Sequence, residues 1–462
     1  MIDSNHSDLL EKVNRLHFVG IGGSGMCPLA EILHGQGYTL TGSDNNETDT
    51  LARIRSYGIP VTLGHAAENI GDAEAVVYTA AVMKDNPELL AAREKGIPVI
   101  ERSILLGILS KKYSNTIGVS GTHGKTTTTS MITQIFMDAK LDPTVVIGGK
   151  LSYIGGNGRL GHSDNMVVEA CEFVDTFLQL TPAISVILNV DEDHLDYFGT
   201  LENIINSFRK FSEQTSKTLV VNGDDENSLK AVEGLQKELI TFGLGENNRY
   251  RAVDIVALSG ARTEFSLLCD GEFLVKITLG IPGKHHIYNA LASAATAHML
   301  GVPPATIAKS LSEFVGAGRR FEILGRPNGI VIADDYAHHP KEVLVTLQAA
   351  AEMGFRSVWA VFQPFTYSRT SLLLDDFADA LSVADHVVMT EIMGAREVNT
   401  YNVYTADLAK KIDGSVWFNT FEEVADHIVA HAQEGDLVIT LGCGDIYKAA
   451  KLILKKYEQK NA

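Results

Sequence analysis

The stretch that decides the fold runs from residue 115 to residue 139 and reads NTIGVSGTHGKTTTTSMITQIFMDA. Residues 116–119 are apolar enough for a buried strand, and a glycine turn follows at Gly121 to Gly124. A helix is then expected to continue to Ala139. Strand, glycine turn and helix in this order are typical of a parallel α/β sheet whose turn can bind phosphate.

The residue types in this turn favour a nucleoside triphosphate as the ligand. Glycines let backbone N–H groups close around phosphate oxygens, Lys125 can reach the β and γ phosphates, and the Thr126 hydroxyl can ligate Mg²⁺. The GxxxxGK[ST] pattern is incomplete, because it would require glycine at Val119. A chance Gly-Lys-Thr at a helix start is the alternative, but the strand before and the helix after disfavour it. The predicted triphosphate loop comprises Gly121, Thr122, His123, Gly124, Lys125, Thr126 and Thr127.

A second glycine turn lies near the start of the chain, where Gly20-Ile-Gly-Gly-Ser-Gly25 fits GxGxxG between an expected strand and an expected helix. Asp44 follows at a distance suited to a ribose hydroxyl. Taken alone, this pattern indicates a dinucleotide-binding dehydrogenase. It requires only a diphosphate at a helix N-terminus, so NAD and a UDP-sugar are both compatible, and a turn without any ligand is the third interpretation.

Acidic and imidazole side chains follow two expected strands, at residues 165–169 and 183–190. Glu172 comes after the first strand, and His194 lies in the segment NVDEDHLD, residues 189–196, after the second. The carboxyl ends of parallel strands meet at one edge of a sheet, so both side chains are expected beside the triphosphate loop. With Thr126 they are candidate Mg²⁺ ligands. Mg²⁺ prefers oxygen donors, so a capping role for His194 stays an alternative.

The rest of the chain also alternates between strand and helix patterns. A polar linker is expected at residues 110–115, a second domain boundary at residues 316–320, and hairpin signals occur at Gly260 and at Asp270-Gly271. Beyond residue 330, strands are expected at 330–333, 357–362, 386–389 and 436–441, with helices at 341–353, at 372–381 and near the C-terminus. Three α/β domains are predicted, at residues 1–112, 113–321 and 322–462, and the central sheet is expected to be mostly parallel.

Composition agrees with a multidomain globular protein. The 462 residues exceed what one hydrophobic core supports, and 45% hydrophobic with 21% charged residues is ordinary globular usage. A net charge of −18 argues against binding to nucleic acid or to an anionic membrane. No apolar stretch is long enough for a membrane helix, so a cytoplasmic location is expected. The scattered cysteines lack metal-ligand spacing and are expected to be buried free thiols, at Cys27, Cys171, Cys269 and Cys443.

Taken together, the motifs resemble those of the Mur ligases over about residues 16–448. They are GIGGSGM (20–26), Gly42-Ser-Asp44, GTHGKTTT (121–128), EACE (169–172), NVDEDHLD, DDYAHHPKEV (334–343), FQPFTYSRT (362–370) and LGCGDIYK (441–448). The resemblance implies an N-terminal Rossmann-like domain for UDP, a central P-loop ATPase-type domain, and a C-terminal Rossmann-like domain for the amino acid and ATP.

The activity implied by the resemblance is an ATP-dependent ligation of L-alanine to UDP-N-acetylmuramate through an acyl phosphate, in peptidoglycan precursor synthesis. ATP and Mg²⁺ are the implied cofactors, with Mn²⁺ as an alternative metal. Neither nucleic acid nor a membrane is expected as a partner, and the enzyme would be a monomer or a homodimer.

The resemblance also assigns site residues. Those implied near the UDP-sugar are Gly22, Gly23, Ser24, Gly25, Met26, Asp44, His65, Thr79, Ala80, Asn157 and Arg159. His285, Asn289, Arg320, Asp335 and Tyr336 are implied at the adenosine part of ATP, besides the triphosphate loop. The implied catalytic residues are Lys125, Glu172, His194, His338 and Arg369, of which His338 and Arg369 would meet the alanine and the reacting carboxylate.

The chain departs from the family pattern at two places. His286 replaces an asparagine expected near the adenine, and Phe365 with Thr366 replaces a frequent His-Arg pair, which removes one guanidinium near the substrate. Three alternatives remain: a dehydrogenase, which leaves Lys125 without a purpose; a GTPase-type switch, whose Asn-Lys-x-Asp element is missing; and the tripeptide-recycling ligase of the same family, which FQPFTYSRT disfavours.

Overall fold

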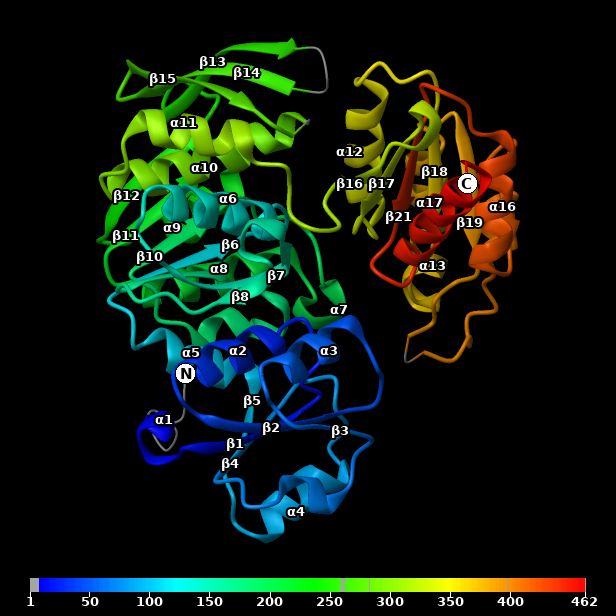
Figure 1. Cartoon of the computed structure of the whole chain (residues 1–462). Coiled ribbons are helices and arrows are strands. Elements are labelled where there is room, and N and C mark those ends of the chain that lie inside the picture. The colour runs from blue at the N-terminus through cyan, green and yellow to red at the C-terminus, as the bar shows by residue number, and fades with distance from the viewer. Residues whose placement is uncertain (1–7, 259–261, 282, 396, 462) are drawn as a thin grey trace. The chain divides into compact units, whose positions relative to one another are not determined.

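The computed structural model describes residues 8–258, 262–281, 283–395 and 397–461. They form two compact units. Unit 1 comprises the chain up to Ile255 with Glu264–Leu279 and His285–Phe314, and unit 2 comprises Val256–Thr263, Gly280–Lys284 and the chain from Val315 onward. Three sheets with surrounding helices make up these units (Figure 1). The α/β fold class predicted from the sequence is confirmed.

The first sheet of unit 1 has five strands in the order β3-β2-β1-β4-β5, all parallel. The order reverses between β1 and β4, and ligands of open α/β sheets bind at such a switch point, outside the carboxyl ends of the strands. The turn after β1 is therefore well placed for a ligand. The elements are α1 (Leu9–Lys12), β1 (Arg15–Val19), α2 (Cys27–Gly35), β2 (Thr39–Asp44), α3 (Asp49–Ser56), β3 (Val61–Leu63), η1 (Ala67–Ile70), β4 (Ala75–Tyr78), α4 (Pro87–Glu94), β5 (Val99–Glu101) and α5 (Arg102–Ser110).

The second sheet has ten strands in the order β15-β14-β13-β12-β11-β10-β6-β9-β7-β8. Strand β6 pairs in parallel with both β10 and β9, so the segments that follow these three strands meet at one sheet edge. The elements are β6 (Asn115–Ser120), α6 (Lys125–Asp138), β7 (Thr144–Leu151), η2 (Ser152–Ile154), β8 (Gly156–Arg159), β9 (Asn165–Glu169), η3 (Phe173–Gln179), β10 (Ile184–Ile187), α7 (Leu195–Phe198), α8 (Leu201–Gln214), β11 (Thr218–Asn222), α9 (Glu226–Val232), β12 (Glu238–Gly243), β13 (Tyr250–Leu258), β14 (Arg262–Cys269), β15 (Glu272–Leu279), α10 (Lys284–Met299) and α11 (Pro304–Glu313).

The third sheet, in unit 2, has six strands in the order β16-β17-β21-β18-β19-β20, and only β16 is antiparallel to its neighbour. Separate apolar clusters cover its two faces, one including Val343 and Phe377 and the other including Ile428 and Ile453. The elements are β16 (Glu322–Gly325), η4 (Pro327–Gly329), β17 (Val331–Asp335), α12 (Pro340–Ala351), β18 (Val358–Phe362), α13 (Tyr367–Leu372), α14 (Leu374–Leu381), β19 (His386–Thr390), α15 (Thr405–Ala409), β20 (Val416–Phe418), α16 (Phe421–His431), β21 (Leu437–Leu441) and α17 (Tyr447–Asn461).

Most strands lie within a residue or two of their predicted positions. The hairpin at Asp270-Gly271 is confirmed, because both residues have positive φ, +52° and +82°, as a type I′ turn requires. Gly260, the other hairpin signal, lies outside the described residues. The helix predicted at 372–381 is confirmed as α14, which begins two residues later, at Leu374, directly after the short helix α13. The predicted domain limits at residues 112 and 321 stay a prediction.

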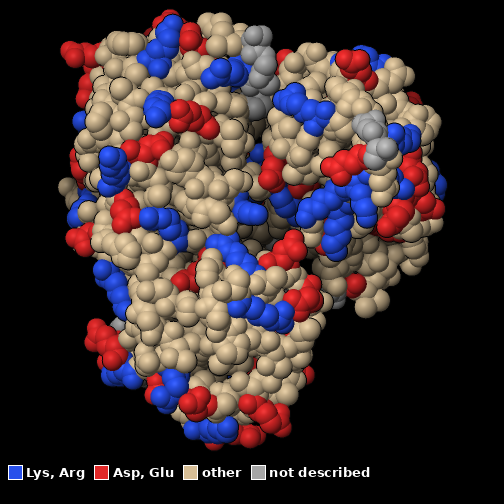
Figure 2. Space-filling model, viewed as in Figure 1, with Lys and Arg blue, Asp and Glu red and all other residues tan. Residues whose placement is uncertain are grey.

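Figure 2 shows acidic and basic side chains interspersed over the visible face. Within the described ranges, no helix combines the length and apolarity that crossing a membrane needs. All four cysteines are free, but burial was predicted correctly only for Cys27, because Cys171, Cys269 and Cys443 are partly exposed.

Candidate active site

The triphosphate loop is held in shape by two glycines and one asparagine. Gly121 and Gly124 have φ of +146° and +83°, and a Cβ at Gly121 would lie 2.9 Å from Leu188 Cβ. Asn189 clamps the loop: its Oδ1 accepts from His123 N at 2.8 Å, and its Nδ2 donates to His123 O at 3.2 Å. The sequence identified the loop but assigned no role to Asn189, although its position after β10 was a usable signal.

Lys125 is the first residue of α6, and its ammonium is bound by protein oxygens. Nζ donates to Gly121 O at 2.6 Å, to Thr122 O at 3.1 Å and to Glu172 Oε1 at 2.9 Å. Burial opposes protonation of the amine, but the Glu172 carboxylate outweighs it and the pKa of Lys125 is raised. The lysine is thus a fixed positive charge at the loop, paired with a carboxylate that is only 2% exposed.

Glu169 is a site residue that sequence reasoning missed. Its Oε1 accepts from the Thr126 hydroxyl at 2.9 Å, and its Oε2 accepts from Gly148 N at 2.6 Å. It ends β9, directly beside β6 in the sheet. The motif EACE contained both acids, so two carboxylates at this strand end could have been expected. Glu169 contacts the threonine of the loop, and Glu172 contacts its lysine.

His194 lies at the start of α7, with φ of +50°. Its Nε2 lies 3.7 Å from Asp193 Oδ2, and its ring packs on Phe173 at 4.5 Å between centroids. No described contact joins it to Thr126 or Glu172. Within the described part of the chain, no group of three or more His, Cys, Asp or Glu side chains is arranged to hold a metal.

The glycine turn at residues 20–25, which is the first along the chain and is called the first glycine turn below, contacts residues at the ends of the neighbouring strands β2 and β4. Gly22 N donates to Asp44 Oδ2 at 3.0 Å. Asp44, which was predicted to bind a ribose hydroxyl, therefore contacts the turn itself. Thr79 lies against the turn as well, because a Cβ at Gly20 would come within 2.7 Å of its Cγ2. Turn, Asp44 and Thr79 are therefore brought together as predicted.

His65 belongs to a buried polar cluster centred on Glu88. The Glu88 carboxylate is fully buried, and it accepts from Ser43 Oγ at 2.6 Å and from Asn69 Nδ2 at 2.5 Å. His65 Nδ1 lies 3.1 Å from Glu88 Oε2, and His17 Nε2 lies 3.7 Å from it. Burial alone would raise the pKa of Glu88, but its hydrogen bonds lower it to about 2. The sequence gave no signal for this cluster.

The two residues of β8 that were predicted to bind the sugar, Asn157 and Arg159, have different surroundings in the structure. Asn157 Nδ2 donates to Ser24 O at 2.6 Å and so touches the first glycine turn. Arg159 instead forms an ion pair with Asp142 and donates to Pro143 O at 2.7 Å. Asn157 is brought to the turn, whereas Arg159 is engaged with the loop before β7.

The adenosine-side residues in unit 1 lie at the start of α10. Asn289 packs against the triphosphate loop, because a Cβ at Gly124 would lie 2.5 Å from Asn289 Oδ1. Its Nδ2 lies 3.1 Å from His286 Nδ1, and the exposed His285 ring lies 4.0 Å from the His286 ring. The histidine that departs from the family pattern therefore orients Asn289.

The remaining predicted residues lie in unit 2, around the end of β17. Burial raises the pKa of Asp335 to about 6, although it accepts from Phe321 N and Ala337 N, both at 2.7 Å. The Arg320 guanidinium lies 5.0 Å from the centre of the Tyr336 ring. His338 Nδ1 lies 3.2 Å from Glu342 Oε2, within the same unit.

Arg369 lies in α13, after β18. Thr366, one of the two residues that differ from the family pattern just before α13, has φ of +64° and donates its N–H to Met393 O at 2.9 Å. The departure thus forms an ordered turn just before α13.

A lysine-bearing glycine turn at the start of α6, together with the glycine turn at residues 20–25 in the same unit, is the arrangement expected of a nucleotide-dependent enzyme. Three family models cover the chain in order: Mur ligase family, catalytic domain (residues 15–114), Mur ligase middle domain (119–297) and Mur ligase, glutamate ligase domain (319–444). The chain belongs to the Mur ligase family.

Similar proteins match over nearly the full length. UDP-N-acetylmuramate–L-alanine ligase of Caldanaerobacter subterraneus subsp. tengcongensis is 43% identical over 97% of this chain and 98% of its own length. The ligase of the same name from Acetivibrio thermocellus is 44% identical over 96% of each. The crystal structure of UDP-N-acetylmuramate–alanine ligase from Thermotoga maritima has a TM-score of 0.84 and 30% identity, covering 96% of this chain and 99% of that one.

Proposed function

We propose that the protein is an ATP-dependent ligase that joins L-alanine to UDP-N-acetylmuramate in peptidoglycan precursor synthesis. One observation carries the proposal: a lysine-bearing triphosphate loop and a diphosphate-type glycine turn belong to the same compact unit. The full-length likeness to relatives bearing that name supports it. A dehydrogenase would need only the glycine turn at residues 20–25 and would not need the triphosphate loop.

Lys125 is assigned to the β and γ phosphates of ATP. In the structure its ammonium is bound by Glu172 and two loop carbonyls, so a triphosphate would replace some of these oxygens with phosphate oxygens. Its raised pKa keeps the lysine charged at neutral pH. A fixed cation beside the γ phosphate lowers the barrier by stabilising charge on the transferred group.

The residues at the loop also fit a divalent cation. Thr126 Oγ1 and the Glu169 and Glu172 carboxylates are oxygen donors at one sheet edge, which is the donor type that Mg²⁺ prefers. When bound, Mg²⁺ would neutralise phosphate charge. Thr126 and Glu172 are the ligands predicted from the sequence, and Glu169 is a third candidate. His194 stays a prediction.

The reaction follows from the chemistry of the substrates. A carboxylate oxygen of UDP-N-acetylmuramate attacks the γ phosphorus, the bond to the ADP oxygen breaks, and an acyl phosphate forms. The amine of L-alanine then attacks the acyl carbon, phosphate leaves, and the amine gives up a proton as the amide forms. Activation is needed because an unmodified carboxylate is a poor electrophile. His338 and Arg369 remain the predicted contacts of the amino acid and the reacting carboxylate.

The same proposal extends to the setting of the enzyme. We infer a cytoplasmic location, because both nucleotide substrates and four unpaired cysteines suit a reducing compartment. A monomer or homodimer is proposed, with UDP-sugar binding assigned to residues 1–112, ATP binding to 113–321, and amino acid and ATP binding to 322–462.

The test is phosphate release from ATP by the purified protein with UDP-N-acetylmuramate and each of several amino acids and peptides. Release is expected only with both substrates present, and L-alanine should be the preferred amine. Preference for a tripeptide would instead identify the recycling ligase. NAD(P) reduction without ATP consumption would contradict the assignment altogether.

A further inference from the structure

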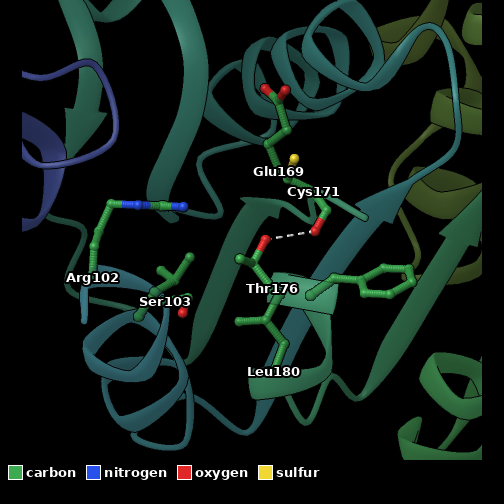
Figure 3. A pocket seen from close by; sticks show the side chains of 8 residues that line it. Arg102, Ser103, Glu169, Cys171, Thr176 and Leu180 are labelled. Carbon is green, nitrogen blue, oxygen red and sulfur yellow. Dashed lines mark hydrogen bonds between the residues drawn. The ribbon is translucent and has the colours of Figure 1, made fainter. Parts of the chain in front are cut away.

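Arg102 is a charged residue that belongs to neither the first glycine turn nor the triphosphate loop, and it has no role in the site described above. It begins α5, directly after β5, and is half-buried. It lines a small pocket in unit 1, between α5 and the segment from the end of β9 to η3, which contributes Glu169 and Cys171. Figure 3 shows its side chain extended across this pocket, while the Glu169 carboxylate points away from it.

The guanidinium lies directly over the first glycine turn. A Cβ at Gly25 would lie 2.9 Å from Arg102 Cδ and 3.1 Å from its Nη1. Glycine at this position is therefore what allows the arginine to approach the turn. On the neighbouring residue of the turn, Ser24 O accepts from Asn157. Arg102 and Asn157 thus contact adjacent residues of one turn from two different elements.

Among the described residues, no hydrogen bond or ion pair satisfies this guanidinium. The nearby carboxylates have other partners: Glu101 accepts from Ser103 Oγ at 2.7 Å, and Glu169 accepts from Thr126 and Gly148. Arg53 of α3 shows the usual outcome for a partly buried arginine, because its Nε lies 2.7 Å from Glu31 Oε1. A guanidinium is permanently charged and presents two parallel N–H groups, so without a protein partner it is suited to bind an anionic ligand.

The position of this charge relates it to both turns of unit 1. It touches Gly25 of the first glycine turn, and its pocket includes Glu169, which contacts Thr126 of the triphosphate loop. For the γ-phosphoryl group of ATP on the triphosphate loop to reach the sugar acid on the glycine turn at residues 20–25, the reacting carboxylate must lie between the two turns. Both a diphosphate and a carboxylate match the two parallel N–H bonds of a guanidinium.

We propose that Arg102 binds the UDP-sugar acid through one of its anionic groups, the diphosphate or the lactyl carboxylate, and positions it between the two turns. The inference rests on the proposed function. It adds a substrate-contacting arginine from α5 to the residues assigned to the sugar nucleotide in unit 1.

The test is calorimetric titration of the full chain and its Arg102→Ala and Arg102→Lys variants with UDP, UDP-N-acetylglucosamine and UDP-N-acetylmuramate. Loss of a charged hydrogen-bond partner should weaken binding by about 10- to 100-fold in Arg102→Ala. Arg102→Lys, which keeps the charge but loses the fork, should fall in between. An equal loss for all three ligands assigns the diphosphate, and a loss confined to UDP-N-acetylmuramate assigns the carboxylate.

Controls separate this role from a structural one. Arg93→Ala removes an exposed arginine of α4 that donates only to Lys84 O, and should change no affinity. ATP affinity should also be unchanged in the Arg102 variants. Unaltered affinity for all three uridine ligands, or an equal loss of ATP affinity, would overturn the proposal. Failure of the wild-type chain to bind UDP-N-acetylmuramate would instead refute the proposed function.

Discussion

At the scale of single residues, the candidate site depends on charges that are held by precise partners. Lys125 and Glu172 form a buried pair at the triphosphate loop, and Glu88 is a buried carboxylate surrounded by donors. Removing one member of such a group leaves the other without compensation, which is costly in a dry environment. Substitutions here should therefore report on function and stability together.

Lys125→Ala should reduce kcat for ligation by about 10³-fold, because the cation that stabilises the transferred phosphoryl group is lost. The unpaired Glu172 should also lower the melting temperature. Affinity for UDP-N-acetylmuramate should stay within about twofold, since the loop does not form that site. Phosphate release and calorimetric titration measure the two effects. Lys230→Ala, an exposed lysine on α9, is the matched control. Near-normal ligation by Lys125→Ala would refute the assignment.

Glu88→Gln should destabilise the protein at neutral pH by about 1–3 kcal/mol, because one hydrogen-bond acceptor becomes a donor facing donors. The folded pKa of Glu88 is lowered from 4.5 to about 2, so its ionised form stabilises the fold above pH 4.5. That contribution is lost as the pH falls from 4.5 towards 2. The difference in melting temperature between wild type and variant should therefore be largest at pH 7 and should narrow below pH 4.5.

Differential scanning fluorimetry across this range provides the measurement. Glu94→Gln, at an exposed position of the same helix α4, should show no such pH dependence. A wild-type-to-Glu88→Gln difference that is constant from pH 7 to pH 3 would show that the buried carboxylate is not ionised in the fold.

At the scale of elements, close backbone packing joins the first two sheets. Strand β8 lies on helix α2, and a Cβ at Gly158 would come within 2.5 Å of Pro28 Cα. Arg53 of α3 reaches the same hairpin, donating from Nη1 to Gly155 O at 2.8 Å. The small residues of β8 therefore set the distance between the glycine turn before α2 and the central sheet.

Gly158→Val should force β8 away from α2, because backbone atoms cannot yield as a flexible side-chain tip does. A loss of about 1–3 kcal/mol in stability is expected, together with a higher KM for UDP-N-acetylmuramate, because Asn157 would move from Ser24. The KM for ATP should change less. Thermal unfolding and steady-state kinetics test this, with the exposed Ser152→Ala in the same hairpin as control. An equal rise in both KM values would contradict the local explanation.

These elements also show how far sequence patterns reach. The two glycine turns were predictable, because each couples a residue pattern to the strand before it and the helix after it. Glu169 and Asn189 follow predicted strands, so their place at the sheet edge could be expected, but their contacts with Thr126 and His123 could not, since these join strands that are neighbours only in the folded sheet. Arg159 illustrates the converse: its place in the family pattern gave no sign that Asp142 would pair with it.

At the scale of the whole molecule, the two units have separate apolar cores and are expected to unfold as separate transitions. The chain contains only two tryptophans, and both Trp359 and Trp417 lie in unit 2. Trp359 is 5% exposed and donates from Nε1 to Asp436 Oδ2 at 3.0 Å. Tryptophan fluorescence should therefore report the unfolding of unit 2 alone, whereas calorimetry reports both units.

UDP, which lacks the reacting carboxylate, should raise only the melting temperature of unit 1, which tryptophan fluorescence does not detect, because the residues proposed to bind the uridine diphosphate lie in unit 1. At a ligand concentration one hundred times Kd, the stabilisation should be about 2.7 kcal/mol. Trp417→Phe should leave the fluorescence midpoint unchanged, which would assign the signal to the buried Trp359. If the ligand shifted the fluorescence midpoint as far as the calorimetric one, the units would unfold together and their assignment as independent cooperative bodies would be wrong.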